Sequence, residues 1–155
     1  MAVMDIGLAI AAWNTILETV SFDHPEYDLI EIKRTYFTTP PESEQLHTGD
    51  MPLAISDFTL VRVDTYSQYQ VQVYDIHTQV LVHDAEWDVA TDIATRLLKP
   101  IIDALMADIT LNNTVTRSEI RGGTPTLVAV DWAKRKVPGL DLFLQVFMNE
   151  GAVIA

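Results

Sequence analysis

Two segments of the chain place apolar residues at helical spacing. Near the N-terminus these residues follow one another at steps of three and four, at Ile6, Ile10, Trp13, Leu17 and Val20. This period is typical of an α-helix with one buried face, and Asp5 just before it is a suitable N-cap. The residue before a proline avoids the helical conformation, so His24-Pro25 limits this region. We therefore expect a first helix over about residues 6–20.

A second, longer segment has the clearest helical pattern in the sequence. Apolar residues step by four along it, at Val89, Ile93, Leu97, Ile101 and Leu105. The pattern predicts one amphipathic helix over about residues 85–107, with Asp84 as its cap and Asn112-Asn113 closing it. Pro100 lies inside this helix and removes one backbone donor, so we expect a kink or a division into two helices.

Much of the remaining sequence has the composition or the two-residue period of β-strands. Residues 27–37 are rich in β-branched and aromatic residues, and residues 69–76 alternate as a half-exposed strand does, forming a hairpin with 58–66. Residues 79–83 fit a short strand or the approach to the long helix. Further strands are expected over 114–121 and 126–133, joined by a turn at Gly122-Gly123, and over 140–148 after a turn at Pro138-Gly139.

Residues 38–57 interrupt this pattern with prolines, a glycine and carboxylates, which predicts a long loop. Loops of this length inside domains are usually functional or mobile. Its turn-forming residues are therefore candidates for an interface with a partner: Pro40, Pro41, Gly49 and Pro52. The order helix, strands, long helix, strands predicts a single α+β domain over residues 1–155. Its mostly antiparallel β-sheet should pack against the two helices on one face.

Charge and cysteine content exclude several classes of function. The chain has no cysteine, which excludes a disulfide scaffold, a thiolate zinc site and a cysteine nucleophile. Its 22 acidic residues outnumber its 10 Lys and Arg residues, for a formal net charge of -12. Nucleic-acid binders need basic side chains for phosphate contacts, so sequestration of DNA or RNA is not expected. The apolar run at 6–12 follows Asp5 without a basic region and is too short to span a membrane. We therefore expect no membrane association, and a location in the cytosol or in a particle assembled there.

The titratable residues form no recognised catalytic or metal-binding motif. The four histidines lack zinc-ligand spacing, no serine lies in a Gly-x-Ser-x-Gly elbow, and no phosphate-binding glycine loop is present. One local cluster could form a metal or general-base site, although a solvated sheet edge is the interpretation we favour: Asp75, His77, His83 and Asp84. We expect no catalytic residue, no cofactor and no metal.

Two smaller groups have simpler interpretations. The carboxylates of Asp23 and Glu26 flank His24-Pro25, which is typical of a turn. The basic run Lys134-Arg135-Lys136, close to Trp132, could contact phosphate or an acidic partner, and a charged turn between two strands is the favoured interpretation.

In layout the chain resembles the tail terminator, or tail completion, proteins of long-tailed bacteriophages. The features that carry the resemblance are the apolar N-terminal helix, the turn-rich segment around Pro40-Pro41, and the pattern from Tyr69 to Tyr74 that leads into the helix over 90–105. The closing strand from Leu142 to Phe147 also fits. The long loop and Pro100 are features that the family does not account for.

The resemblance implies a β-sheet flanked by helices and a structural protein of the virion tail. It implies a homo-oligomeric ring, most simply a hexamer, that caps the tail tube, ends its polymerisation and joins the tube protein to the head connector. DNA would pass through the ring without specific binding, and the acidic composition suits such a bore. Candidate carboxylates for its lining are Asp64, Asp75, Glu119 and Asp141. Three alternatives stay open: another head-tail joining protein such as a neck or head-completion protein, a small enzyme, and an adaptor domain.

Overall fold

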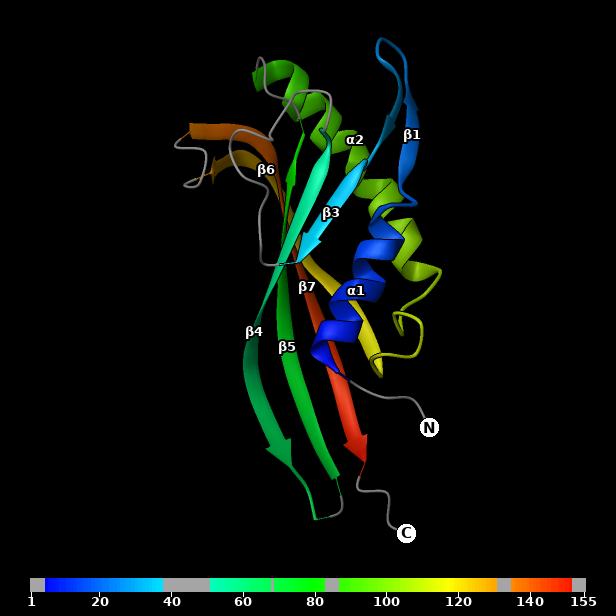
Figure 1. Ribbon diagram of the computed structural model, residues 1–155, viewed down its shortest axis with the longest axis vertical. Coiled ribbons are helices and arrows are strands. Elements are labelled where there is room, and N and C mark those ends of the chain that lie inside the picture. The colour runs from blue at the N-terminus through cyan, green and yellow to red at the C-terminus, as the bar shows by residue number, and fades with distance from the viewer. Residues whose placement is uncertain (1–4, 38–50, 68, 83–86, 131–134, 152–155) are drawn as a thin grey trace.

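The computed structural model describes residues 5–37, 51–67, 69–82, 87–130 and 135–151. Within these ranges two helices lie on one side of a five-stranded sheet, and a separate two-stranded sheet extends beside them (Figure 1). The expected α+β class is confirmed. None of the helices in the described ranges is long and apolar enough to cross a membrane.

The first helix, α1 (Ile6–Leu17), forms where the apolar period predicts it. The Asp5 carboxylate accepts a hydrogen bond from the Leu8 backbone N–H at 3.1 Å, so Asp5 is the N-cap as expected. The helix ends at Leu17 and not at Val20. Its buried stripe consists of Ala9, Ile10, Trp13 and Leu17.

The second helix, α2 (Trp87–Met106), runs without interruption through Pro100 and so is not divided in two. Its buried face is made of the residues that the sequence pattern selects: Ala90, Ile93, Ala94, Leu97, Ile101 and Leu105. The helix ends before Asn112-Asn113, which instead form a turn with Leu111, all three at positive φ. The expected cap Asp84 lies outside the described residues.

The main sheet has the strand order β3-β4-β5-β7-β6. Its members are β3 (Arg34–Phe37), β4 (Leu53–Thr65), β5 (Tyr69–Leu81), β6 (Arg117–Val130) and β7 (Arg135–Gly151). All neighbours pair antiparallel except β3 and β4, which are parallel. The mostly antiparallel sheet covered on one face is therefore as predicted, with one parallel pair at its edge.

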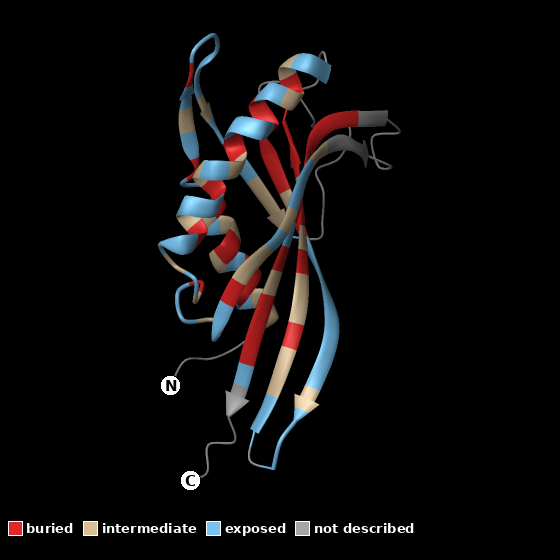
Figure 2. Ribbon diagram, turned by 180° about the vertical axis from the view of Figure 1, so that it is seen from behind, coloured by how far each residue is buried: buried red, intermediate tan, exposed pale blue. Residues whose placement is uncertain are grey.

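Beyond the helices, the far half of the β4–β5 hairpin extends as a long arm, with β7 paired to β5 along its length (Figure 1). β3 pairs with β4 only over Leu53–Ser56, so no described strand lies on the outer edge of β4 from Asp57 onward. Figure 2 shows that the lower part of β4 is mostly exposed, whereas the lower part of β5 is exposed only at its turn end and is otherwise intermediate or buried. We call residues 57–74, with Gln68 excepted, the β4–β5 arm.

The strand expected over residues 27–37 is wrong in its extent. The structure has two strands there, β2 (Asp28–Glu31) and β3, and β2 pairs with an unexpected strand, β1 (Ser21–His24). The chain changes sheet between them, because the Ile32 N–H donates to the Val20 carbonyl and the Lys33 N–H donates to the Pro52 carbonyl. A run of β-branched and aromatic residues does not reveal this change of partner.

Two predicted turns are also wrong. Gly122 and Gly123 lie inside β6, paired with Phe143 and Leu142, and neither glycine has the positive φ that a hairpin turn of this kind requires. Pro138 and Gly139 lie inside β7, with Pro138 just beyond the end of β5, where a proline removes no bond of that ladder. Residues 79–81 do not form a separate strand either, since they continue β5.

The predicted long loop is shorter than expected at its C-terminal end. Residues 53–57 belong to β4, because Leu53 and Ala54 are buried and pair with both β3 and β5. Of the candidate interface residues in this segment, Pro52 is buried. The other three, Pro40, Pro41 and Gly49, lie outside the described residues.

The two faces of the main sheet have different surroundings. The face toward α1 and α2 carries the main core, with Ile76, Val80, Leu142, Leu144 and Val146 packed beneath the helices. The opposite face, which we call the outer face, has a smaller apolar cluster at one end, made of Met51, Leu53, Leu81 and Val137. The rest of the outer face carries mostly polar, charged and aromatic side chains, with the aliphatic Val71 and Val73 among them.

Candidate functional site

Asp75 and His77, half of the predicted titratable cluster, lie on the outer face of the sheet. The His77 Nε2 is 3.0 Å from the Asp141 Oδ1, and the His77 ring stacks on Phe143 at 4.8 Å between centroids. Asp75 accepts a hydrogen bond from the Gln145 side chain at 3.1 Å. His83 and Asp84 lie outside the described residues. Across the ranges with described structure, no group of three or more His, Cys, Asp or Glu side chains could hold a metal ion.

All four candidate bore carboxylates lie on this outer face, as the strand register shows. Each of them has a donor partner. Asp64 pairs with Arg62 at 3.0 Å, and Glu119 lies 3.2 Å from Arg121 and 3.8 Å from Arg117. Asp75 and Asp141 have the partners given above. Because these groups offset one another, the outer face is close to electrically balanced.

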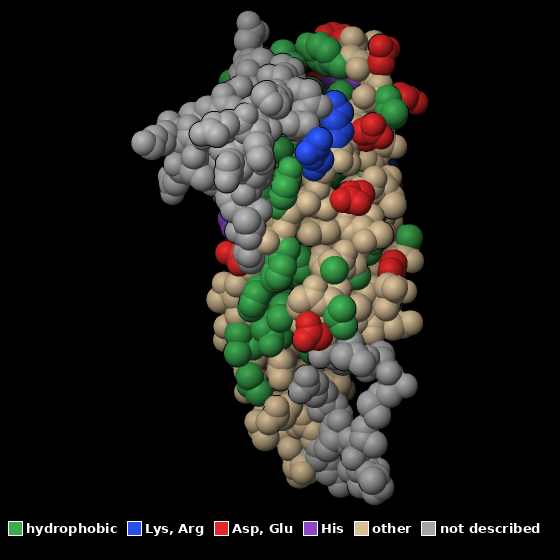
Figure 3. Space-filling view, viewed as in Figure 1, with side chains coloured by type: hydrophobic (Ala, Val, Ile, Leu, Met, Phe, Trp, Pro, Cys, Tyr) green, Lys and Arg blue, Asp and Glu red, His purple; other side chains and the backbone are tan. Residues whose placement is uncertain are grey.

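Five carboxylates and four arginines make up the charged side chains described on the outer face: Asp57, Asp64, Asp75, Glu119 and Asp141, with Arg34, Arg62, Arg117 and Arg121. The helix side is far more acidic. The helix side, together with β1 and β2, has ten described carboxylates and only three described basic residues. These are Asp5, Glu18, Asp23, Glu26, Asp28, Glu31, Asp88, Asp92, Asp103 and Asp108, with Lys33, Arg96 and Lys99. In Figure 3 acidic side chains are spread over the region where Figure 1 draws the helices and β1.

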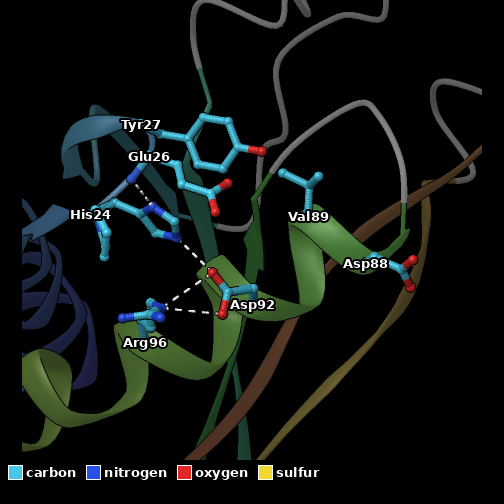
Figure 4. A pocket seen from close by; sticks show the side chains of 8 residues that line it. His24, Glu26, Tyr27, Asp88, Val89, Asp92 and Arg96 are labelled. Carbon is cyan, nitrogen blue, oxygen red and sulfur yellow. Dashed lines mark hydrogen bonds and ion pairs between the residues drawn. The ribbon is translucent and has the colours of Figure 1, made fainter.

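A pocket of about 350 Å³ lies between the β1–β2 turn and α2 (Figure 4). The His24 side chain forms its floor and is only 3% exposed. His24 Nε2 is 2.6 Å from Asp92 Oδ2, and Asp92 is also bonded to the Nε of Arg96 one helical turn later. Tyr27 covers the imidazole at 4.9 Å between ring centroids.

Both nitrogens of the His24 ring are engaged. Nδ1 accepts a hydrogen bond from the Glu26 backbone N–H at 3.0 Å, so this nitrogen carries no proton and the Nε2–H donates to Asp92. A general base needs a lone pair that can reach a substrate proton. The only basic lone pair of this ring is occupied by the backbone and buried. The His24–Asp92 pair therefore resembles a catalytic dyad in composition, yet its geometry is that of a latch between the β1–β2 hairpin and α2.

The neighbours of Asp92 in this latch change the pKa of its carboxyl group. The His24 hydrogen bond, together with the hydrogen bond and charge of Arg96, lowers the pKa of the Asp92 carboxyl below its usual value of 3.8. Asp92 stays ionised and holds the β1–β2 turn at neutral pH. Sequence reasoning assigned His24 to a turn but missed its partner, because Asp92 is 68 residues away and nothing local joins the two.

One surface of the described residues is apolar and exposed. Exposed hydrophobic side chains gather on the β4–β5 arm and its flank: Phe37, Phe58, Leu60, Val61, Val63, Tyr66 and Tyr69. Phe37 stacks on Phe58 at 6.1 Å between centroids, and Phe58 meets Tyr74 edge to face at 6.0 Å. In Figure 3 a stripe of hydrophobic side chains follows the part of the molecule where β4 and β5 lie. The hairpin of residues 58–66 and 69–76 was predicted from the sequence, but not that Phe58, Leu60, Val61 and Val63 of its first strand would be exposed.

The sequence matches no protein-family model, and no curated protein matches it significantly. Any functional assignment therefore depends on the geometry described above.

Proposed function

We propose that this protein is a structural subunit of a phage tail: a tail terminator that assembles into a ring, caps the tail tube and connects it to the head. The observation that carries the proposal is the exposed apolar β4–β5 arm. Isolated soluble proteins rarely expose contiguous apolar patches of this kind, and such patches mark surfaces that bind other proteins. An arm that leaves the body of the subunit can reach a neighbouring copy or the tube.

The chemistry of the described residues is consistent with this role. The one buried histidine pair lacks a free lone pair, and the outer-face cluster is an exposed network of paired charges. These arrangements stabilise the subunit. The same features fit a neck or head-completion protein, and the number of copies in the ring distinguishes the two assignments.

The charge distribution supports a DNA passage on the helix side of the subunit. DNA carries a high density of phosphates, and an acidic wall repels it over about 8 Å at physiological salt. The outer-face carboxylates Asp64, Asp75, Glu119 and Asp141 lie beside arginines, histidine or amide donors that offset their field. The helix side has the larger excess of carboxylates, and we place the DNA path there.

The test of assembly compares two substitutions of exposed apolar residues by lysine. Leu60 on the arm is 48% exposed and Met106 at the end of α2 is 69% exposed, so neither substitution disturbs the core. Native mass spectrometry and negative-stain microscopy of the purified full-length chain should show a ring for the wild type and for Met106→Lys. Leu60→Lys should reduce the ring to monomers while its circular dichroism spectrum stays unchanged.

Two results would refute the proposal. A wild-type protein that stays monomeric at high concentration, alone and with purified tube protein, is not a ring-forming subunit. Equal assembly of Leu60→Lys and Met106→Lys would mean that the arm is not the surface on which copies meet. A closed ring that contains a number of copies other than six would favour the neck-protein assignment.

A further inference from the structure

We infer that the joint of the ring is a strand pair between two copies, in which the free edge of β4 on the arm pairs antiparallel with the free edge of β6 of the next copy. This inference rests on the proposed ring and adds the residues of its interface. It follows from the two open edges of the main sheet, from the charges along them and from the direction of the strands.

The main sheet ends in two unpaired strand edges within the described residues. On one side β4 has no strand beside it after Ser56, and on the other side β6 pairs only with β7. Unpaired edges present a row of backbone N–H and C=O groups that readily pair with another chain. The exposed edge of β4 carries Val61 and Val63 and has neither lysine nor proline to discourage such pairing. The length and composition of this edge suit a strand that pairs with another chain when the protein assembles.

Strand direction favours pairing of β4 with β6 between copies of the same orientation. β4, β5, β7 and β6 alternate in direction, so β4 and β6 of one chain are antiparallel to each other. A ring places every copy in the same orientation about its axis. The β6 edge of one copy then meets the β4 edge of the next as an antiparallel pair, and the contact is of the head-to-tail kind that closes rings.

The charges along the two edges are complementary in one antiparallel register. On the outer face of β4 the order is Asp57, Thr59, Arg62, Asp64, and on β6 it is Arg117, Glu119, Arg121, Thr124. When Asp64 faces Arg117, Arg62 faces Glu119, Thr59 faces Gly122 and Asp57 faces Thr124, and Arg121 is the bulge residue between Glu119 and Gly122. In this register every charge on one edge meets an opposite charge or a neutral side chain. A parallel register that places Asp57 opposite Arg117 would set Arg62 opposite Gly122 and next to Arg121, and two neighbouring arginines repel.

The other face of the two strands agrees with this register. Leu60 on β4 then faces Ile120 on β6, an exposed and a half-buried aliphatic side chain. The register shift after Leu60 lies opposite the register shift after Ile120, so the two irregular positions coincide. Across the sheet of one chain, Arg62 on β4 is at the same height as Arg117 on β6. In the joint Arg62 faces Glu119 of the next copy. Each copy is therefore shifted from its neighbour by two residues, roughly 7 Å along the strands. Closed sheets require such a stagger between tilted strands.

Cysteine cross-linking tests the joint directly, because the chain has no cysteine of its own. In the Arg62→Cys/Glu119→Cys variant the two thiols of one chain are separated by β5 and β7, about 14 Å, so any disulfide joins two copies. Mild oxidation should convert this variant into a covalent ladder that ends at the full ring. The off-register variant Arg62→Cys/Thr124→Cys should form at least tenfold less cross-linked product. Neither single cysteine variant should form covalent dimers.

A charge exchange provides an independent readout without oxidation. Arg62→Glu should raise the dissociation constant of the ring at least tenfold, and the added change Glu119→Arg should restore assembly to within about threefold of the wild type. Covalent dimers of a single cysteine variant would show symmetric pairing of like edges and overturn the joint. The joint would also be overturned if the wild type forms a ring and the Arg62→Cys/Glu119→Cys variant assembles without cross-linking. That result would leave the proposal of a ring intact. A monomeric wild type would instead refute the proposed function.

Discussion

The hydrogen bond between His24 and Asp92 makes the stability of the protein depend on pH. The pKa of Asp92 is lower in the folded protein than in the unfolded chain, where it has the ordinary value of 3.8. The stabilisation is therefore fully present above that unfolded value and is lost as the pH falls through the lower folded pKa. Asp92→Asn should unfold at a lower denaturant concentration than the wild type at pH 7, and the two midpoints should converge as the pH falls below the lowered pKa of Asp92.

A matched control separates the latch from general surface charge. Asp103 also lies on α2 and pairs with Lys99 at 2.8 Å, but both groups are largely exposed. Exposed pairs of this kind contribute little, so Asp103→Asn should shift the midpoint much less than Asp92→Asn at pH 7. A difference between wild type and Asp92→Asn that persisted unchanged to pH 2 would contradict the linkage to this carboxyl.

A second residue-scale prediction concerns the buried polar chain under α1. The Trp13 indole N–H donates to the Thr78 hydroxyl at 2.9 Å, and that hydroxyl is 2.9 Å from the Ser56 hydroxyl. Thr78→Val leaves the indole N–H unpaired in a dry core, which should cost about 1–3 kcal/mol of unfolding free energy. In a Trp13→Phe background no indole N–H needs a partner, so the same substitution should cost less. Denaturant titration of the four variants gives the coupling, and purely additive losses would contradict the bond.

At the scale of elements, α2 packs on β6 through a glycine. A Cβ at Gly123 would lie 2.9 Å from the end carbons of both Leu98 and Leu142, whereas a Cβ at Gly122 would meet nothing within 4 Å. Gly123→Ala should therefore destabilise the protein by about 1–3 kcal/mol, since a packed core resists added volume. Gly122→Ala, one position away, should change stability by about 0.5 kcal/mol or less.

Thermal or denaturant unfolding of the two variants checks this contrast. In Gly123→Ala the clash involves side-chain ends, so the further change Leu98→Ala should recover part of the loss. Similar midpoints for Gly122→Ala and Gly123→Ala would show that α2 does not rest on β6 at this point.

The same glycines show why some elements were predictable from the sequence and others were not. α1 and α2 were found because their apolar periods and the Asp5 cap are local signals that packing reinforces. Gly122-Gly123 and Pro138-Gly139 have the composition of turns, yet tertiary contacts keep both pairs inside strands. The partner of His24 and the apolar arm depend on residues distant in sequence, so no local pattern could reveal them.

At the scale of the whole molecule, the two sides of the sheet have different tasks in the proposed ring. Strand pairing at the edges leaves both faces free, so one face lines the bore and the other faces outward. The outer face is nearly balanced in charge, whereas the helix side carries a large excess of carboxylates. A wall that repels DNA needs uncompensated negative charge, which favours the helix side for the bore.

Charge reversal on each side tests which face lines the bore. One variant carries Asp23→Lys and Glu31→Lys on the helix side, and the other carries Asp75→Lys and Asp141→Lys on the outer face, on the inner strands β5 and β7 and away from the proposed joint. Both variants gain the same charge, so both attract DNA, but only linear duplex DNA can thread a closed ring. The preformed helix-side ring should retain linear DNA at least tenfold more strongly than circular DNA of the same length. That preference should fall with rising salt, because binding to phosphates releases counterions and added salt therefore weakens it.

The outer-face variant should bind linear and circular DNA equally. The opposite pattern, with the linear preference in the outer-face variant, would place the bore on the strand carboxylates Asp64, Asp75, Glu119 and Asp141.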